Sequence, residues 1–412
     1  MFDHGKMFSP AQAQFLRRCA LLFAFLLSGG NNIFPRVPLA IGIVLICFLL
    51  HGMTFGLRKE MRALGVLMLA TFSVAIVGSQ EFLTSAIAIR FTNFALGGLL
   101  LAIYVALPKR QFVDDVYPMF WLMAWQAILT VFLGTFFSGL FTPVDVNETV
   151  YNTIFWVFTW HSAIEDATLF VRANGFFFEP GVFQMYLNIF LFMAAFLRKS
   201  PKDVALATMA VLATQSTMGL VIAAIQIGAY YLYSLKSMRF STKLLTTVLA
   251  PIVMVPLLFI VLTNVSDKIG GQFQGSAWAR TYDFNTGLAI ALENPLIGIG
   301  FDYERYYEES QLVGYKETRL DDRTLVNRGN SNGVITVLYS VGIPLALIFF
   351  YGLFAQSFFA QRWIFAGVMF MSLTTEALFF SPFVLMIVYS GLLLKPKTVP
   401  IAVWRARRLS AA

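Results

Sequence analysis

The sequence predicts an all-α polytopic membrane protein, because it combines many hydrophobic residues, few charges and recurring apolar runs. Of its 412 residues, 58% are hydrophobic and only 13% are charged, and the mean hydropathy is +0.72. In soluble domains about a quarter of the residues are charged. Apolar runs of about 18 to 24 residues, enough to cross a bilayer as a helix, recur along the chain. Together these observations exclude a soluble fold.

About twelve transmembrane helices are expected, each an apolar run bounded by charged or turn residues. The first is read as an uncleaved helix, because no small-residue cleavage site follows it. The seventh and eleventh are short for a bilayer that needs about 20 residues per helix. The expected spans are 16–30, 38–55, 62–78, 84–107, 116–140, 180–197, 203–215, 218–235, 244–263, 332–354, 361–376 and 378–394.

The distribution of lysine and arginine predicts the orientation of these spans. Most of the basic residues lie in alternate short loops, which the positive-inside rule places in the cytoplasm together with both chain termini. The same distribution accounts for the net charge of +8 without nucleic acid as a partner. Residues 1–412 are therefore expected to form one membrane domain, with two long outer loops at 141–179 and 264–331.

Both long loops are expected to contain short helices and to carry any chemistry, since the polar residues are concentrated there. In the first loop, the stretch 147–170 has apolar residues at roughly helical spacing and predicts an amphipathic helix in the membrane interface. The second loop is the most polar part of the chain. The outer face is therefore the expected place of the functional site.

The stretch "VRANGFFFEPG" at the end of the first loop holds two charges, Arg172 and Glu179. Pro180 suits a first helical position, because its missing N–H would be unpaired there anyway. Glu179 then falls at the helix N-cap, where the helix dipole favours a carboxylate. Alternatively, Glu179 is a general base, with a pKa raised by an apolar surface and lowered by Arg172 and the dipole. The residues leave both interpretations open.

Arginines away from the cytoplasmic loops form a candidate clamp for a diphosphate, since guanidinium binds phosphate through a planar fork of donors. Arg90 lies about 9 Å inside the fourth span, at the helical rise of about 1.5 Å per residue. An ionisable residue at that depth suggests function, and a snorkelling arginine is the competing explanation. For Arg319, Arg323 and Arg328, pairing with the neighbouring Asp321 and Asp322 is the competing explanation.

His161 is a second candidate base, because an unperturbed imidazole titrates near pH 6.5. Cys19 and Cys47 both lie inside apolar runs and imply neither a disulfide nor a metal site. The sequence has no HExxH, CxxC or DxD-type signature. We therefore expect no metal and no cofactor, which argues against a metal-dependent transferase that uses soluble nucleotide sugars.

Several motifs in residues 172–350 resemble the bacterial O-antigen and exopolysaccharide polymerases of the O-antigen ligase/polymerase superfamily. "RANGFFFEPG" is similar to the Arg…Glu-Pro-Gly segment of the polymerases, and "STMGLVIAAI" fits the start of a middle span. "WARTYDFNTGLAIALENPLIGIGFDYE" resembles the outer loop of the superfamily, in which an Arg begins a helix that ends in an "NPLxGxG"-like turn. "GNSNGVITVLYSVGIPLALIFF" resembles the segment that returns to the membrane.

The resemblance implies a metal-independent membrane glycosyltransferase that polymerises undecaprenyl-diphosphate-linked repeat units at the periplasmic face of the bacterial inner membrane. The growing glycan would move onto the non-reducing end of an acceptor unit, in a pathway that also has a flippase and a chain-length regulator. Arg172 and Arg280 match the family's arginines and would bind diphosphate, with Arg90 as an addition. Glu179 matches the polymerase glutamate and would accept the proton of the acceptor hydroxyl.

Ligases of the superfamily carry a histidine where this chain has Asn330 or Asn332, and asparagine cannot act as a base. This difference favours polymerase over ligase and leaves the two asparagines as acceptor-binding or helix-capping residues. Tyr303, Arg305 and His161 are further candidates for binding the acceptor.

Two other enzyme or transport functions stay open, together with a purely structural role. One is a ligase that moves glycan to lipid A core or to another acceptor. Another is a flippase of lipid-linked saccharides, which should place charges midway through several spans and show paired halves. The sequence has its polar residues in the outer loops and no matching halves. A structural scaffold would tolerate loss of Arg172 and Glu179.

Overall fold

Helices make up most of the structure, which is a computed structural model. It describes residues 8–31, 33–51, 59–79, 85–146, 149–160, 171–235, 274–313 and 329–394. The α-helices of these residues are α1 (Pro10–Leu27), α2 (Arg36–His51), α3 (Lys59–Ser79), α4 (Ser85–Val105), α5 (Lys109–Phe136), α6 (Pro180–Phe192), α7 (Pro201–Thr214), α8 (Thr217–Leu235), α10 (Gln274–Glu293), α11 (Tyr303–Leu312), α13 (Gly333–Phe354), α14 (Arg362–Leu373) and α15 (Pro382–Leu393).

The described residues contain six helices that are long and apolar enough to cross a membrane, which makes the chain a multi-pass membrane protein. They are α3, α4, α5, α8, α13 and the continuous helix Pro180–Arg198, in which a π-helical turn, Met193–Arg198, extends α6. Helices α2, α14 and α15 are apolar but shorter. The expected ninth span, 244–263, lies outside the described residues.

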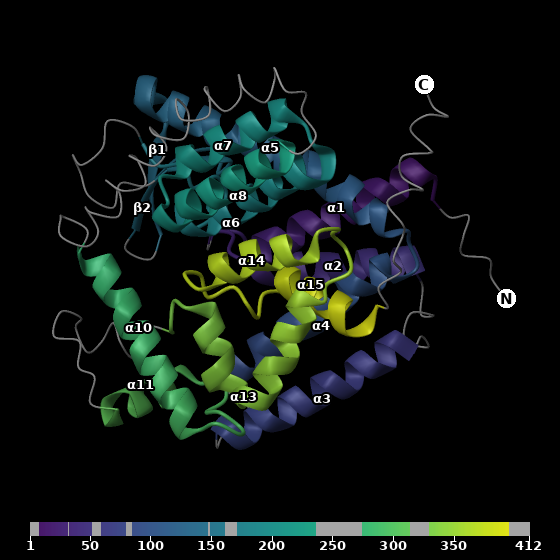
Figure 1. Ribbon diagram of the computed structural model, residues 1–412, viewed down its shortest axis with the longest axis vertical. Coiled ribbons are helices and arrows are strands. Elements are labelled where there is room, and N and C mark those ends of the chain that lie inside the picture. Colours follow the sequence, from purple (N-terminus) through teal and green to yellow (C-terminus); the bar gives the residue numbers. More distant parts are fainter. Residues whose placement is uncertain are drawn as a thin grey trace.

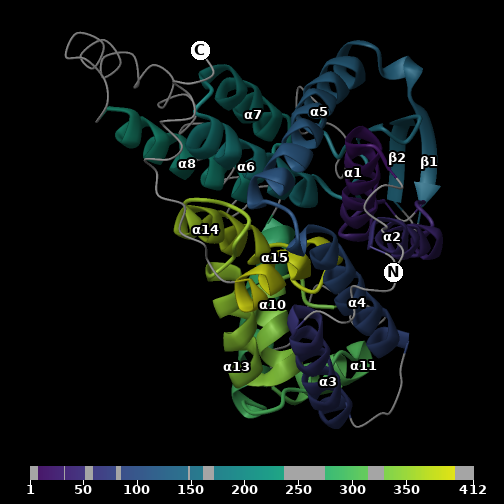
Figure 2. The ribbon, with the colours of Figure 1, turned by 90° about the vertical axis from the view of Figure 1, so that its right-hand side faces the viewer.

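Helix α6 lies at the centre of one group of helices. All of its residues from Pro180 to Phe192 are buried, and it contacts α5, α7, α8 and α14. A second group contains α3, α4 and α13, and α15 packs against all three and against α1 (Figures 1 and 2). A helix enclosed on all sides holds its first residue in a defined place, which matters because Glu179 directly precedes α6.

Polar contacts gather at two opposite ends of the helices. At one end, the Arg17 Nε donates to a buried Asp115 carboxylate oxygen at 2.6 Å, and Arg198 pairs with Asp114 at 3.0 Å. The other end, called here the Glu179 end, brings together the segments 28–31, 171–179, 213–217, 329–332 and 374–381. All five segments fall on the outer side in the orientation that the basic residues predict.

The first long loop contains a β-sheet, so the predicted interfacial helix over 147–170 is wrong for its described part. Strand β2 (Thr149–Ile154) pairs antiparallel with β1 (Thr142–Val146) and with β3 (Phe158–Trp160). Residues in β2 alternate between the two faces: Tyr151 and Thr153 are buried, and Val150 is exposed. β-branched and aromatic residues favour this period of two over a helix. Residues 161–170 lie outside the description.

The described part of the second long loop contains α10 and α11. Its "NPLIGIG" turn (294–300) is joined to a kink in α13. Gly342 interrupts α13 with φ +75° and ψ 161°. Pro344 has no N–H to donate to the carbonyl of Ser340 one turn earlier. The Gly300 amide takes that place and donates to the Ser340 carbonyl at 3.0 Å. The turn after α10 therefore satisfies the backbone of α13, and α10 lies packed against that helix (Figure 1).

Replacing Gly342 with alanine is expected to lower the thermal midpoint of the detergent-solubilised protein. An added Cβ would meet the backbone carbon of Leu296 at 2.5 Å, and the positive φ alone costs about 1–3 kcal/mol for other residues. Gly367→Ala is the matched control, because this α14 glycine has open space around it and alanine favours helix by about 1 kcal/mol. Equal midpoints for the two variants would contradict this account of the kink.

Candidate functional site

The segment 171–179 is fastened from three sides before the chain enters α6. The Ala173 amide donates to the Ala213 carbonyl at the end of α7 at 3.0 Å, and Ala173 also forms a β-bridge with Trp160 of β3. Further along, Phe177 forms a bridge with Gly30 in the turn after α1. This segment, which carries both Arg172 and Glu179, is thus joined to elements from three distant parts of the sequence.

The middle phenylalanine of the "FFF" run holds this segment against α6. The Phe177 side chain is fully buried, and its ring stacks on that of Tyr186 with centroids 4.7 Å apart and an angle of 12° between planes. The Tyr186 hydroxyl donates to the Ser28 carbonyl at 3.0 Å. Stacked aromatic pairs of this kind add about 0.5–1.5 kcal/mol beyond the area they bury. The apolar run therefore fixes the position of the charges on either side of it.

Glu179 occupies the N-cap position of α6, and Pro180 is the first helical residue, as predicted. Its backbone is extended, with φ −141° and ψ 149°, and its side chain makes no capping hydrogen bond to the helix. The residue is exposed. A capping carboxylate would turn back onto the first-turn amides, so the capping interpretation describes the position of Glu179 and not its hydrogen bonding.

Arg172 lies close enough to Glu179 and to Arg280 for its charge to interact with each of theirs. Burial lowers the pKa of Arg172, the Glu179 carboxylate raises it, and the Arg280 guanidinium lowers it. The guanidinium still keeps its charge, because arginine titrates far above neutral pH. Its Nε donates to the Thr214 carbonyl at 3.4 Å at the end of α7. One arginine from each of the two long loops and one carboxylate therefore lie near one another at the Glu179 end.

Tyr151 connects the sheet to the same place. Its hydroxyl donates to the Phe178 carbonyl at 3.0 Å, next to Glu179. Burial raises the pKa of Tyr151, and the negative charge of Glu179 raises it further. Both effects keep the phenol protonated at neutral pH, so a hydroxyl donor lies beside the carboxylate. Sequence analysis missed Tyr151, although the strand pattern of β2 could have indicated its burial.

Arg90 belongs to a neighbouring cluster. Its Nη2 donates to the Tyr303 hydroxyl at 3.3 Å, and its guanidinium lies 5.9 Å from the centre of the Phe380 ring. Among the described residues, no carboxylate lies within salt-bridge distance of Arg90. Arg90 therefore interacts with α11 and the 374–381 segment, and no contact in the described part of the chain joins it to Arg172.

Asn330 is part of a buried polar junction at the start of α13. Its amide nitrogen donates to the Tyr306 hydroxyl at 3.1 Å and also to the Asp283 carbonyl. The Asp283 carboxylate accepts from the Ser331 backbone amide at 3.0 Å and from the Ser331 hydroxyl. This junction ties α10, α11 and α13 together. Asp283 was not predicted as a site residue. Its position three residues after Arg280 on an amphipathic helix is the signal that could have indicated it.

Asn332 and Arg305 both have structural partners. The Asn332 Oδ1 accepts from the Val334 and Ile335 amides at 3.1 and 3.0 Å, which makes it the N-cap of α13. Of the two interpretations given for Asn332, acceptor binding and helix capping, the geometry supports helix capping. Arg305 donates to the Gly78 carbonyl at the end of α3 and pairs with Glu309 one turn later in α11. His161, the other acceptor-binding candidate, lies outside the described residues.

Helix α10 joins the two clusters. Arg280 and Asp283 are three residues apart, a spacing that puts side chains on the same face of a helix. Arg280 interacts with Arg172, and Asp283 binds the 330–332 turn. The charged site and the polar junction at α13 are therefore neighbours along one helix face.

A buried carboxylate that the sequence analysis did not single out also lies at this end. Glu376, in the segment between α14 and α15, is only 5% exposed. A Cβ added at Gly181, the second residue of α6, would lie 3.0 Å from the Glu376 Cδ and would collide with its Oε1. The signal that could have indicated it is an acidic residue in a short turn between two apolar runs.

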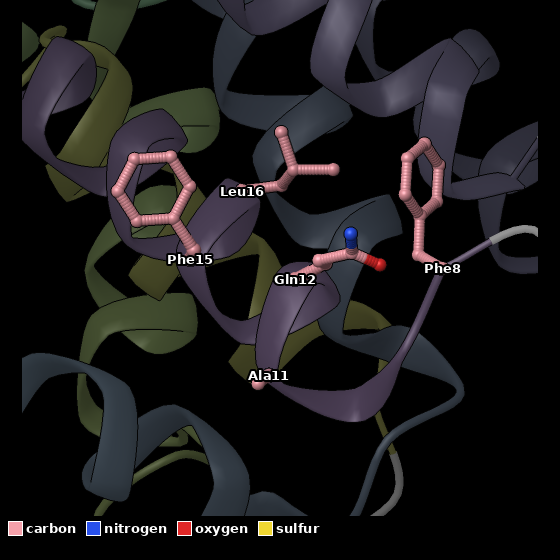
Figure 3. Close-up of a pocket in the computed structure, with 5 residues that line it drawn as sticks. All are labelled: Phe8, Ala11, Gln12, Phe15 and Leu16. Atoms are coloured by element: carbon pink, nitrogen blue, oxygen red, sulfur yellow. The ribbon is translucent and has the colours of Figure 1, made fainter.

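No metal-binding group marks another centre in the part of the chain that the structure describes. These residues contain no group of three or more His, Cys, Asp and Glu side chains placed to hold a metal ion. An open, mainly apolar hollow lies on the first turns of α1, lined by Phe8, Ala11, Gln12, Phe15 and Leu16 (Figure 3). Its side chains come from one short stretch and offer no charged group. The charged cluster at the Glu179 end is therefore the candidate site.

A comparison of the sequence with known protein families found a match. The sequence model of a family described as O-antigen ligase matches residues 204–350. The match includes α10, α11 and most of α13, and Arg172 and Glu179 precede it. No curated protein sequence and no solved structure matches the chain. The match covers 147 of the 412 residues. It supports the resemblance for the motifs between residues 204 and 350, and it does not include the segment that carries Arg172 and Glu179.

Proposed function

We propose that the protein polymerises undecaprenyl-diphosphate-linked oligosaccharide repeat units at the periplasmic face of the bacterial inner membrane, with both termini in the cytoplasm. The observation that carries this proposal is the interaction of Arg172 with both Glu179 and Arg280. A cation pair suits a diphosphate leaving group, and an exposed carboxylate beside it suits an acceptor hydroxyl. A glycosyl transfer from a lipid diphosphate needs both features within reach of one sugar.

In the proposed reaction, the bond from the anomeric carbon of the growing glycan to its diphosphate oxygen breaks. A new bond forms between that carbon and a hydroxyl at the non-reducing end of the acceptor unit. Glu179 accepts the hydroxyl proton. Arg172 and Arg280 stabilise the negative charge that develops on the departing undecaprenyl diphosphate. The acceptor keeps its own lipid diphosphate, so the product can act as donor in the next cycle.

The second candidate is a ligase, because the matched family is described as O-antigen ligase. Ligase and polymerase would share the leaving diphosphate and differ in the acceptor. The residues at the start of α13 favour polymerase: Asn330 and Asn332 stand where the resemblance places the histidine of ligases, and both are committed to hydrogen bonds within the fold. The role of base then falls to Glu179.

Deleting the gene tests the proposal in cells. We expect single lipid-linked repeat units to accumulate at the periplasmic face, because polymerisation stops and upstream steps continue. Accumulation of finished polymer on its lipid carrier would instead support a ligase. Accumulation of single units on the cytoplasmic face would support a flippase, and either of these two outcomes would contradict the proposed polymerase. If single units accumulate as expected, a chain-length regulator of the same pathway can be sought by co-purification with the full-length protein.

A further inference from the structure

The buried carboxylate of Glu376 lies against the first turn of α6, which Glu179 begins. A Cβ at Gly181 would overlap the Glu376 carboxyl group, with Cδ at 3.0 Å and Oε2 at 3.4 Å. Helix α6 has no acidic residue in its first turn, and the Glu179 side chain makes no capping hydrogen bond. A helix N-terminus attracts negative charge, and the acidic side chain that packs against the first turn of α6 comes from a segment about 200 residues later in the chain.

The main chain of Glu376 contacts the start of a second helix. A Cβ at Gly333, the first residue of α13, would lie 2.5 Å from the Glu376 carbonyl oxygen. That carbonyl accepts a hydrogen bond from the Leu378 amide at 2.8 Å, which closes a tight turn around the residue. Glu376 therefore lies between the starts of α6 and α13. The first start carries the proposed base, and the second carries the Asn332 cap.

Glycines at both contacts make this arrangement specific. Gly181 and Gly333 leave the space that the carboxyl group and the carbonyl of Glu376 occupy, and any larger residue would displace them. Glu376 is 5% exposed, although a buried carboxylate is costly unless it meets a positive potential or a hydrogen-bond donor. A carboxylate that served only to fill space would be better replaced by an apolar side chain.

We propose that Glu376 is a positioning residue for Glu179, an inference that rests on the proposed polymerase function. Its carboxylate holds the first turn of α6 and thereby sets the direction of the Glu179 side chain. The negative charge of its carboxylate also partly offsets the positive charges of Arg172 and Arg280. Among the described residues, Arg172 of its own segment and Tyr151 of β2 interact electrostatically with Glu179. Arg280 of α10 interacts with Arg172, and Glu376 of the 374–381 segment contacts the first turn of α6.

The electrostatic part of this role has a definite sign. Arginines beside a carboxylate favour its ionised form and weaken it as a base, whereas a second carboxylate nearby does the opposite. Removing the Glu376 charge should therefore move the acid limb of the pH–rate profile to lower pH.

The test compares the wild type with Glu376→Gln, both purified as full-length protein. The probe is the pool of lipid-linked units extracted from cells that lack this gene. We expect kcat to fall about tenfold to a hundredfold through misplacement of the base, KM to change little, and the acid limb to move to lower pH. Unchanged kcat and an unchanged acid limb would overturn the inference. If the wild type itself converts none of this pool, the proposed function fails first.

A second pair of variants separates positioning from packing. Gly181→Ala should displace the carboxylate while keeping its charge, because the colliding atoms are the end of a flexible side chain. We expect it to lower kcat like Glu376→Gln, while Gly228→Ala, at an α8 glycine with open space around it, serves as the control. The double variant Gly181→Ala/Glu376→Ala refills the space with a methyl group. Recovery of wild-type kcat in that double variant would show that Glu376 only fills space and would overturn the inference.

Discussion

Glu179→Gln is expected to abolish long polymer while leaving the amount of protein in the membrane unchanged. Glutamine keeps the size of the side chain and removes its ability to accept a proton. Loss of a general base typically lowers the rate about 10²–10⁴-fold. The fold should tolerate the change, because the Glu179 side chain is exposed and makes no capping hydrogen bond to α6. Polymer ladders resolved on gels, together with quantitative immunoblots of membranes, measure both quantities.

Glu308→Gln is the matched control for this prediction. Glu308 is an exposed acid of α11 in the second long loop, and its removal changes the net charge of that loop by the same amount. We expect ladders of normal length from this variant. A normal ladder from Glu179→Gln would show that Glu179 is not the base, and it would leave the site without a proton acceptor among the residues named for the reaction.

Arg280→Ala is expected to stop polymer growth as well. The change removes one of the two cations that would stabilise the leaving diphosphate, and loss of one preorganised donor to a developing charge costs about 10²–10³ in rate. Arg280→Lys should recover only part of the activity, because lysine retains the charge and loses the planar fork of donors. The same gels, and release of undecaprenyl diphosphate from lipid-linked units by the purified variant, give the rates.

The control for Arg280 is Arg110→Ala at the opposite end of the helices. Arg110 is 76% exposed and pairs with Asp114 one turn later, an arrangement worth only a few tenths of a kcal/mol. Polymer length should not change in this variant. An active Arg280→Ala protein would show that Arg280 does not bind the diphosphate. Arg172 would then be the one remaining arginine of the two proposed for that role.

Hydropathy and charge distribution predicted the parts of the fold that the membrane dictates. Long apolar helices such as α3, α4 and α13 follow from the bilayer's thickness, and Pro180 correctly indicated where α6 begins. The positive-inside rule put both long loops on one side, and Arg172 and Arg280, which are far apart in sequence, lie close enough for their charges to interact. These features depend on how each segment interacts with lipid or water and on local residue preferences, and both can be read from the sequence.

The parts that sequence reasoning missed depend on which elements become neighbours. The helical spacing of apolar residues in 147–170 was misleading. Residues 149–154 instead form a strand, β2, whose buried and exposed residues alternate and which pairs with β1. Arg90 was grouped with the other arginines, although it contacts Tyr303 and Phe380 instead. Glu376 could not be selected from its own surroundings, because its role follows from contact with α6, which is distant in the chain.

The most direct test of the central claim uses the purified protein in lipid vesicles, supplied with lipid-linked single units from cells that lack the gene. The account predicts longer glycans on the lipid carrier, one undecaprenyl diphosphate released for each new linkage, and pulse-labelled units nearest the carrier. Vesicles that release no diphosphate and form no linkage, or that place the newest unit farthest from the carrier, would contradict it.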